Sequence, residues 1–457
     1  MTTPGGQRRK YPIIGLCDCN NFFVSCERIL DGSLWNVPVI VLSSNDGCVV
    51  ARSNEAKALG IKMGVPYYQI KSLCQYANIR VLSSNLSYYT HVSHKVMDCL
   101  RQFSDTVEVY SIDEAFFNLS IASVSDVERY VSEIRKAVWR TCRIPVSIGI
   151  APNKTYAKLA SEIAKKERAF KGVCRIMPEM CSDPGFLSGI PVSDIWGVGR
   201  KTAESLQRFG VSTVAEFCAR DEVWVKKNFG ITGLSLLWEL QGRMVHCLSS
   251  ETKAPKSVQV SRTFSEKLTE YEELLDPLLC FTASACAQMR RYGLMANKMG
   301  VYISTSRFAD PAENYSNWAD IRFASPKFCD PDFLKAAAGM LKQIYRPGYK
   351  YNKCGVTLYN LVESSAGIQG SLFSEDTEVP EVSAKKRAAA KAIDAINAEA
   401  GKPLVRPAVI CRTEPRTWLP KSEMQSESAR YMAHIEEDKV NQKDRTAFKS
   451  HALDYAG

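Results

Sequence analysis

Apolar and polar residues follow two different periods over the first 176 positions, and this pattern predicts a mixture of strands and helices. Short apolar runs typical of strands lie at residues 11–18, 38–42, 48–52, 107–119 (a strand pair) and 145–150. Apolar positions three or four apart predict helices at residues 21–30, 54–59, 88–103, 126–140 and 153–166. Strands and helices that alternate in this way predict an α+β or α/β catalytic module.

The pattern changes near Met177 and becomes helical. Residues 191–206 are typical of a helix-hairpin-helix, in which Gly197 and Gly199 allow a tight turn and a second helix begins at about Arg200. Such a helix end binds phosphate through its exposed N–H groups and the helix dipole. The alternative is an ordinary turn between two helices.

A mixed pattern returns after a proline-containing linker at residues 249–256 and predicts an independent domain. Its expected elements are strands at 257–264, 298–304 and 353–361 and a long helix at 271–292. Beyond Glu363 the composition is typical of a linker, and it is followed by a helix at 382–400 that ends before Gly401 and Pro403. The stretch from about Ser422 is polar and is expected to be disordered.

Three acidic residues occupy positions where the pattern predicts buried strands. Asp18 ends the first strand, and Asp113 and Glu114 are adjacent within residues 111–117. Buried carboxylates are costly unless cations or hydrogen bonds compensate them, and Mg²⁺ is commonly held by one or two carboxylates together with substrate phosphates. The acids therefore predict phosphoryl or nucleotidyl transfer, with a buried ion pair or a surface hairpin as the alternative. Because neighbours in a strand face opposite sides, Asp113 and Glu114 can share a site only near a bend, or with Glu114 reaching around.

Composition and charge narrow the class of protein. The 457 residues suggest about three domains, and the net charge of +10 around an acidic centre suits a polyanionic partner, although basicity that only aids solubility is the alternative. The 16 cysteines include no Cys-x-x-Cys pair and there are five histidines, which disfavours a structural zinc site. We find no signal peptide and no apolar stretch long enough to span a membrane, and we expect a cytoplasmic protein with free thiols.

Four segments, in this order along the chain, together resemble the Y-family translesion DNA polymerases, and within them the UmuC type that forms the catalytic subunit of bacterial DNA polymerase V. They are residues 18–23 (DCNNFF), 50–64 (VARSNEAKALGIKMG), 110–116 (YSIDEAF) and 147–160 (SIGIAPNKTYAKLA). The resemblance continues through the hairpin into the C-terminal tail. It implies low-fidelity translesion synthesis in the bacterial SOS response to DNA damage.

The resemblance implies an α+β multidomain fold arranged as a right-hand polymerase. The parts would be a palm, small fingers, a helical thumb with the helix-hairpin-helix, an α/β little finger and a C-terminal tail. The expected boundaries are palm 1–20 and 88–176, fingers 21–87, thumb 177–248, little finger 253–361, and a clamp-binding linker with an accessory region at 362–457.

The resemblance also assigns roles to residues of the site. Asp18 and Asp113, with the carbonyl of Cys19, would bridge two Mg²⁺ ions, and Glu114 would hold the ion that activates the primer 3′-hydroxyl. Two such ions stabilise the attacking and leaving oxygens of an in-line displacement. The remaining assignments concern the incoming dNTP and the primed DNA template: Phe23 as an aromatic gate against the 2′-hydroxyl (with Phe22 in the core), Arg52 over the nascent base pair, Asn54, Lys57 and Lys165 on the triphosphate, and Gly197, Gly199, Arg200 and Lys201 on DNA.

Departures from the family pattern lie in the triphosphate contacts. Family members often have Tyr at the Asn54 position and Arg at the Lys57 position, so a hydrogen-bonding group and a cation are kept while a bidentate fork is lost. Asn54 and Lys57, three apart, share one helical face, as do Lys158 and Lys165, seven apart. Either of the last two lysines could instead be solvated.

Partners follow from the resemblance too. Residues 369–373 (QGSLF) resemble the pentapeptide by which bacterial polymerases bind the sliding clamp, with Gln369, Leu372 and Phe373 as anchors in an apolar groove. The tail, with Trp418, would contact a processed UmuD-type dimer and the recombinase filament. No membrane partner is expected.

Two other classes of protein stay open at this point. A nucleotidyl cyclase with a related palm would use the same acids but would need neither the hairpin nor residues 253–361. A catalytically silent DNA- or clamp-binding scaffold would have no need for Asp18, Asp113 and Glu114 together.

Overall fold

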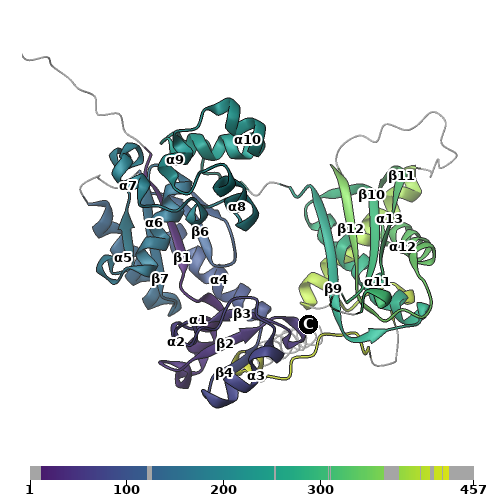
Figure 1. Ribbon diagram of the computed structural model, residues 1–457. Coiled ribbons are helices and arrows are strands. Elements are labelled where there is room, and N and C mark those ends of the chain that lie inside the picture. The colour runs from purple at the N-terminus through teal and green to yellow at the C-terminus, as the bar shows by residue number, and fades with distance from the viewer. Residues whose placement is uncertain are drawn as a thin grey trace, which may run out of the picture. The chain divides into compact units, whose positions relative to one another are not determined.

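The structure is a computed structural model that describes residues 12–120, 126–251, 254–306, 308, 310–364, 380–401, 403–411, 416–424 and 426–431. The chain divides into two compact units (Figure 1). The first contains Met1–Thr252 together with Ser422–Gly457, and the second is Lys253–Lys421. Among the described residues, no helix has the length and apolar character needed to cross a membrane. All sixteen cysteines are free thiols, as expected.

The first unit is built on a five-stranded sheet with the order β5-β6-β1-β7-β8. The strands are β1 (Ile14–Cys19), β5 (Val107–Val109), β6 (Glu114–Asn118), β7 (Val146–Ala151) and β8 (Val173–Arg175). The central strand β1 is buried along its whole length and runs antiparallel to both neighbours, β6 and β7. The strands predicted at 11–18 and 145–150 and the strand pair at 107–119 are confirmed.

Helices cover both faces of this sheet. Alternate residues of β1 point to opposite faces, so Cys17 and Cys19 join the core under α4 (Leu86–Arg101) and α5 (Val127–Cys142). Ile14 and Leu16 face α6 (Lys154–Lys166) instead. Asp18 has the same parity as Ile14 and Leu16, so its carboxylate lies on the α6 side.

A smaller three-stranded sheet, with the order β3-β2-β4, lies between β1 and α4 in the chain. Its strands are β2 (Val39–Leu42), β3 (Val49–Arg52) and β4 (Arg80–Ser83). Its flanking helices are α1 (Phe22–Leu30), α2 (Asn54–Ala58) and α3 (Tyr67–Tyr76). Helix α3 and strand β4 were not predicted from the sequence, because only Cys74 of α3 is buried and β4 is four residues long.

The helical part of the first unit contains α7 (Pro184–Ser188), α8 (Arg200–Arg208), α9 (Val214–Cys218) and α10 (Glu222–Leu240). Helix α8 begins at Arg200, as predicted. Gly197 has a φ of 91°, a left-handed conformation that favours glycine, whereas Gly199 has a φ of −78° that any residue adopts. The turn therefore requires glycine at Gly197 and not at Gly199.

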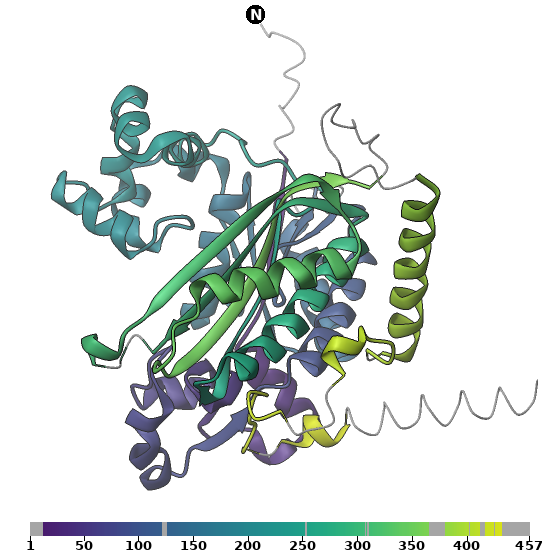
Figure 2. The ribbon, with the colours of Figure 1, turned by 90° about the vertical axis from the view of Figure 1, so that its right-hand side faces the viewer.

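The second unit contains a four-stranded antiparallel sheet with the order β11-β10-β12-β9. The strands are β9 (Ser257–Leu268), β10 (Leu294–Thr305), β11 (Ser316–Lys327) and β12 (Tyr351–Glu363), and the helices are α11 (Tyr271–Arg291), α12 (Asp330–Ile344) and α13 (Pro380–Ala400). Helices α11 and α12 lie against the sheet and share one apolar core with it (Figure 2). The pattern predicted β9, β10, β12, α11 and α13, and missed β11 and α12.

The C-terminal residues that the structure describes are packed against both units. Trp418 is buried in the core of the second unit, where its indole N–H donates to Asp276 Oδ2 at 2.7 Å. Residues 426–431 lie against the first unit, and Ser428 is fully buried. The expectation of disorder from Ser422 is therefore wrong for these described residues, because buried polar partners in the first unit hold them.

Candidate active site

Antiparallel pairing of β1 with β6 brings the predicted acids together. Asp18 and Glu114 are directly opposite each other in the register, so their side chains lie on the same face of the sheet. The backbone N–H of Cys19 donates to the Asp113 carbonyl at 2.9 Å. Asp18 and Glu114, which are distant in the sequence, therefore meet at one end of the central strand, and the backbone of Asp113 lies beside them.

Asp113 lies in a bend immediately before β6, not inside the strand. The Ser111 hydroxyl donates to Asp113 Oδ1 at 2.6 Å, and the Ser111 N–H donates to the Glu114 carbonyl at 3.1 Å, which closes a tight turn. The alternation of side chains in a regular strand does not apply across this bend. Of the two arrangements that sequence predicted, the structure contains the bend.

Two lysines of α6 occupy the face of the helix toward the acids. Lys165 forms an ion pair with Asp18, and Lys158 forms one with Glu114. The prediction that the two lysines share one helical face is confirmed, and neither is simply solvated. Lys165 also contacts Glu162 at 3.1 Å. In the protein without metal, Lys158 balances the charge of Glu114, while Lys165 pairs with Glu162 and contacts Asp18.

Burial and the hydrogen bond between Asp18 and Glu114 shift the pKa values of these two acids in opposite directions. Asp18 is 3% exposed, and burial together with its hydrogen bond to Glu114 raises the pKa of Asp18 to about 8 despite Lys165. Burial also raises the pKa of Glu114, but hydrogen bonds with Asp18 and Lys158 outweigh it and leave that pKa below its usual value. Asp18 therefore keeps a proton at neutral pH while Glu114 is ionised.

The donor chemistry of this site fits a hard divalent cation. Among the residues that the structure describes, no three His, Cys, Asp or Glu side chains are arranged to hold a metal ion. Lys165, Lys158 and Ser111 contact the three carboxylates. The donors themselves are carboxylate oxygens, the type that Mg²⁺ and related ions prefer.

The adjacent aromatic residues at the start of α1 have different surroundings. Phe22 is 4% exposed and belongs to the core, as expected. Phe23 is half-buried, and its ring stacks on that of Tyr89 with 4.5 Å between centroids and 19° between planes. Phe23 thus presents one face to its surroundings while a buried aromatic supports the other.

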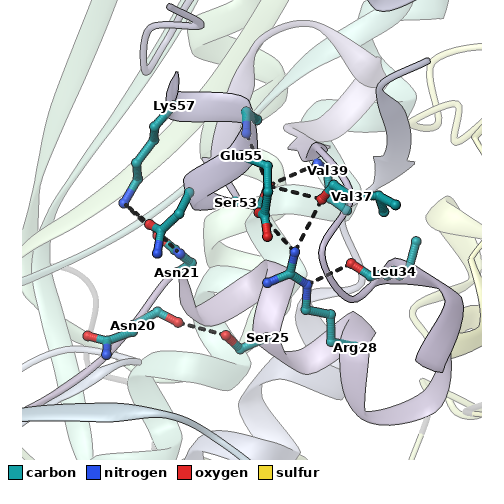
Figure 3. A network of polar contacts seen from close by, with 12 residues as sticks. Asn20, Asn21, Ser25, Arg28, Leu34, Val37, Val39, Ser53, Glu55 and Lys57 are labelled. Atoms are coloured by element: carbon teal, nitrogen blue, oxygen red, sulfur yellow. Dashed lines mark hydrogen bonds and ion pairs between the residues drawn. The ribbon is translucent and has the colours of Figure 1, made fainter. Parts of the chain in front are cut away.

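Two of the residues expected at the triphosphate, Asn54 and Lys57, contact Asn21, as Figure 3 shows for Lys57. Lys57 Nζ donates to Asn21 Oδ1 at 2.6 Å, and Asn21 Nδ2 donates to Asn54 Oδ1 at 3.1 Å. Burial, then the nearby charges of Arg52 and Lys165, lower the pKa of Lys57. Four of the predicted nucleotide contacts are therefore brought into one electropositive neighbourhood, with the shared face of Asn54 and Lys57 confirmed.

Arg52 and Arg28 add detail that the sequence did not indicate. Arg52 donates to the Ile61 carbonyl, and its Nε is buried without a hydrogen-bond partner. Arg28 is buried and joins α1 to α2 and to the segment before β2: it donates to the carbonyl of Leu34 at 2.8 Å and pairs with Glu55 at 3.1 Å (Figure 3). Nothing local in the sequence marks Arg28, because its partner Glu55 is distant along the chain and its other partners are backbone carbonyls.

The structure describes the residues predicted to bind DNA but not those predicted to bind the clamp. Arg200 and Lys201 are exposed in the first turn of α8, whose N-terminal N–H groups have no side-chain cap. Arg200 makes an exposed contact with Glu204 at 3.6 Å. The proposed clamp peptide with Gln369, Leu372 and Phe373 lies outside the described residues.

Comparisons with known proteins agree along the chain. Residues 17–162 match the impB/mucB/samB family, residues 184–211 match the IMS family HHH motif, and residues 255–372 match the impB/mucB/samB family C-terminal domain. Protein UmuC of Salmonella typhimurium is 34% identical over 85% of this chain and 92% of its own length. Protein ImpB of Salmonella typhimurium is 35% identical over 79% of this chain and 86% of its own length.

More distant relatives extend the same picture. DNA polymerase IV 1 of Bacillus subtilis is 30% identical over 90% of this chain and 95% of its own length. A solved Y-family DNA polymerase chimera of Dbh and Dpo4 aligns with a TM-score of 0.65 and 21% identity, over 77% of this chain and 99% of that chain. That likeness establishes the right-hand polymerase fold. The chain therefore belongs to the impB/mucB/samB family of Y-family translesion DNA polymerases.

Proposed function

We propose that this chain extends a primed DNA template by nucleotidyl transfer from dNTP, with Asp18, Asp113, Glu114 and the Cys19 carbonyl as ligands of two Mg²⁺ ions. The observation that carries the proposal is the direct pairing of Asp18 with Glu114 beside the bend at Asp113. Family membership supports low-fidelity synthesis across lesions in the SOS response. Divalent ions bound there supply charge stabilisation for the reacting phosphate and acidify the primer 3′-hydroxyl.

The chain's own residues bind and orient the substrates. Lys57, Lys165 and Asn54 are proposed to hold the triphosphate, and Arg52 to lie over the nascent base pair. Their common neighbourhood supports this assignment. Phe23 is proposed to exclude ribonucleotides, because a ring held firmly from behind by Tyr89 would clash with a 2′-hydroxyl.

Domain roles follow the architecture. We assign the palm to residues 1–20 and 88–176, the fingers to 21–87, the thumb to 177–248 and the little finger to 253–361. Gly197, Gly199, Arg200 and Lys201 are proposed to bind the DNA backbone, since an uncapped helix end with exposed cations suits phosphate.

Partners complete the proposal. Residues 369–373 would bind the sliding clamp, and residues 362–457 would include contacts to a processed UmuD-type dimer and the recombinase filament. Similarity to Protein UmuC supports the accessory partners. A cytoplasmic location is part of the proposal, and the similarity to DNA polymerases supports it.

Primer extension with dNTP and Mg²⁺ tests the proposal, with the wild-type chain compared with Asp113→Ala and Glu114→Ala. Each change should abolish incorporation while leaving affinity for primed DNA unchanged, because the proposed DNA grip lies elsewhere. The assay is repeated with the accessory dimer and recombinase filament if the chain alone is silent. Incorporation that survives either change would reject the assigned metal ligands, and silence under all conditions would favour the scaffold alternative.

A further inference from the structure

A tail segment, made up of residues 422–424 and 426–431, forms polar contacts with the first unit that no motif accounts for. At its start, the Glu423 N–H donates to Asp46 Oδ2 at 2.8 Å. The Ser83 N–H donates to the Met424 carbonyl at 3.2 Å, so Met424 pairs with the end of strand β4. The tail segment is therefore fastened to the smaller sheet through its backbone.

Further along the tail segment, Ser428 reaches a buried carboxylate. Glu27 of α1 is 1% exposed, and Ser428 is fully buried. The Ser428 hydroxyl donates to Glu27 Oε1 at 2.7 Å. Burial raises the pKa of Glu27, while hydrogen bonds from Tyr89 and Ser428 counteract that rise. A carboxylate this deeply buried depends on such donors, because water reaches it poorly.

The second donor to the same oxygen is the residue that supports Phe23. The Tyr89 hydroxyl donates to Glu27 Oε1 at 2.6 Å, and Tyr89 is completely buried. Its ring is the one that stacks on Phe23 at 4.5 Å. Ser428, Glu27, Tyr89 and Phe23 thus form a continuous chain of contacts from the tail segment to the proposed sugar gate.

A second contact fixes the same region. Tyr431 packs edge-on against Tyr88, the neighbour of Tyr89 in α4, with 5.7 Å between ring centroids. The tail segment is therefore linked to two consecutive tyrosines of α4. Tyr431 contacts Tyr88 directly, and Ser428 is linked to Tyr89 by way of Glu27. A surface contact of no consequence would not require a fully buried hydroxyl aimed at a buried carboxylate.

From this chain of contacts we infer that Ser428 and Glu27 are positioning residues for sugar selection, which hold Tyr89 behind Phe23. The inference rests on the proposed gate role of Phe23. Loss of the Ser428 hydroxyl leaves Glu27 with one donor fewer, so the Tyr89 ring is held less firmly. Phe23 then yields more readily to a 2′-hydroxyl, and discrimination between dNTP and NTP falls.

The test measures kcat/KM for one dNTP and its matching NTP in the full chain, with the accessory partners if these are needed. Ser428→Ala should lower the dNTP/NTP selectivity by about three- to tenfold, the size expected when one hydrogen bond to a buried carboxylate is lost. The loss should come mainly from faster NTP insertion, because the metal ligands are unchanged. Ser428→Thr keeps the hydroxyl and should keep wild-type selectivity.

Two further variants test whether the effect on selectivity comes from the hydrogen bonds to Glu27 or from any change in the tail segment. Tyr89→Phe keeps the ring and removes the same hydrogen-bond network from its other end, so it should lower selectivity and combine with Ser428→Ala less than additively. Glu427→Gln changes an exposed neighbour that pairs only at the surface with Arg430 at 2.7 Å, and it should leave selectivity unchanged.

The outcomes distinguish this inference from the proposed function. If Phe23→Ala lowers selectivity while Ser428→Ala reduces dNTP and NTP insertion equally, the gate stands and the positioning role is overturned. If Phe23→Ala itself leaves selectivity unchanged, the gate role is rejected first.

Discussion

Replacement of Asp18 by Asn should remove a specific pH dependence of stability in the protein without metal. Asp18 has a pKa of about 8 in the folded protein against an ordinary value of 3.8. The folded state therefore holds a proton that the unfolded state releases between these two values, and stability falls as pH rises through this interval. Asn cannot ionise, so the variant lacks this loss.

The expected magnitude follows from linkage. A proton that the folded state keeps and the unfolded state releases lowers the free energy of unfolding by up to about 1.4 kcal/mol for each unit of rising pH, or by about 4 kcal/mol between pH 5 and pH 8. The lowered pKa of Glu114 changes the stability only below pH 4.5, and the raised pKa of Lys165 changes it only above pH 10.5. Neither group therefore contributes to the pH dependence between pH 5 and pH 8. Other groups, including Glu27, contribute equally to both proteins and cancel in the comparison.

The assay is urea unfolding followed by tryptophan fluorescence in EDTA, at several pH values from 5 to 8. The difference in unfolding free energy between Asp18→Asn and wild type should grow in favour of the variant as pH rises. Asp113→Asn, which leaves the Asp18–Glu114 pair intact, should keep the wild-type pH dependence. Parallel curves for wild type and Asp18→Asn would refute the shared-proton description of the site.

Divalent metal should reverse the trend for the wild-type chain only. Metal ligation requires a deprotonated carboxylate, so the stabilisation from saturating Mg²⁺ should increase from pH 5 to pH 8 and should be much smaller in Asp18→Asn. Equal stabilisation of both proteins would place the ion elsewhere.

Three further predictions concern packing, a buried acid and the clamp. Gly149→Ala should destabilise the first unit by about 3 kcal/mol, because the added Cβ would lie 2.1 Å from a backbone carbonyl of α6. The control Gly189→Ala should be tolerated, because the nearest atom to its Cβ would be 3.4 Å away. Equal unfolding midpoints for the two variants would contradict this prediction. Glu239→Gln should cost about 2–4 kcal/mol, since its buried carboxylate accepts three backbone N–H groups at 2.7–3.2 Å, and a change in unfolding free energy near zero would count against that role. Leu372→Ala with Phe373→Ala should weaken affinity for the sliding clamp without changing basal primer extension, and unchanged affinity would show that the peptide is only linker.

The elements that sequence predicted are those with strong apolar periodicity. Strand β1 is buried at every position, and α8 begins where Gly197 and the following pattern place it. Some elements that the sequence did not predict have weak patterns: β11 contains no fully buried residue, and α10 is interrupted at Gly230, whose φ is 67°. Helix α12 was missed although its buried apolar residues recur at helical spacing. Local periodicity carries no signal for an element that exposes most of its side chains.

The site could be predicted as far as residue types and order allow. The three acids and the shared face of Lys158 and Lys165 follow from strand ends and helical spacing. The partners of these lysines do not, because Lys165 and Asp18 are 147 residues apart and only the fold brings them together. For the same reason nothing in the sequence marks Glu27 or Ser428, which are 401 residues apart.

Helix α6 supplies lysines that pair with acids on three places of the five-stranded sheet. Three of its lysines lie on one face, four and seven residues apart, and each holds one acid of the sheet. The pairs are Lys154 with Glu108, Lys158 with Glu114, and Lys165 with Asp18. Of these acids, Glu108 also accepts the Ser249 N–H at 2.9 Å and lacks a partner acid opposite it in the register, so its pair is structural.

The other two pairs lie at the end of β1, where Asp18 and Glu114 face each other. Burial of this pair is costly even when Asp18 keeps its proton, because Glu114 stays ionised, so the fold requires positive charge at this place whether or not metal is bound. Lys158 and Lys165 meet that requirement, and in the proposed function Lys165 would use its long flexible side chain to reach the triphosphate once a divalent ion is held by the carboxylates. The same residues thus account for a stable fold without metal and for the proposed binding of nucleotide with metal.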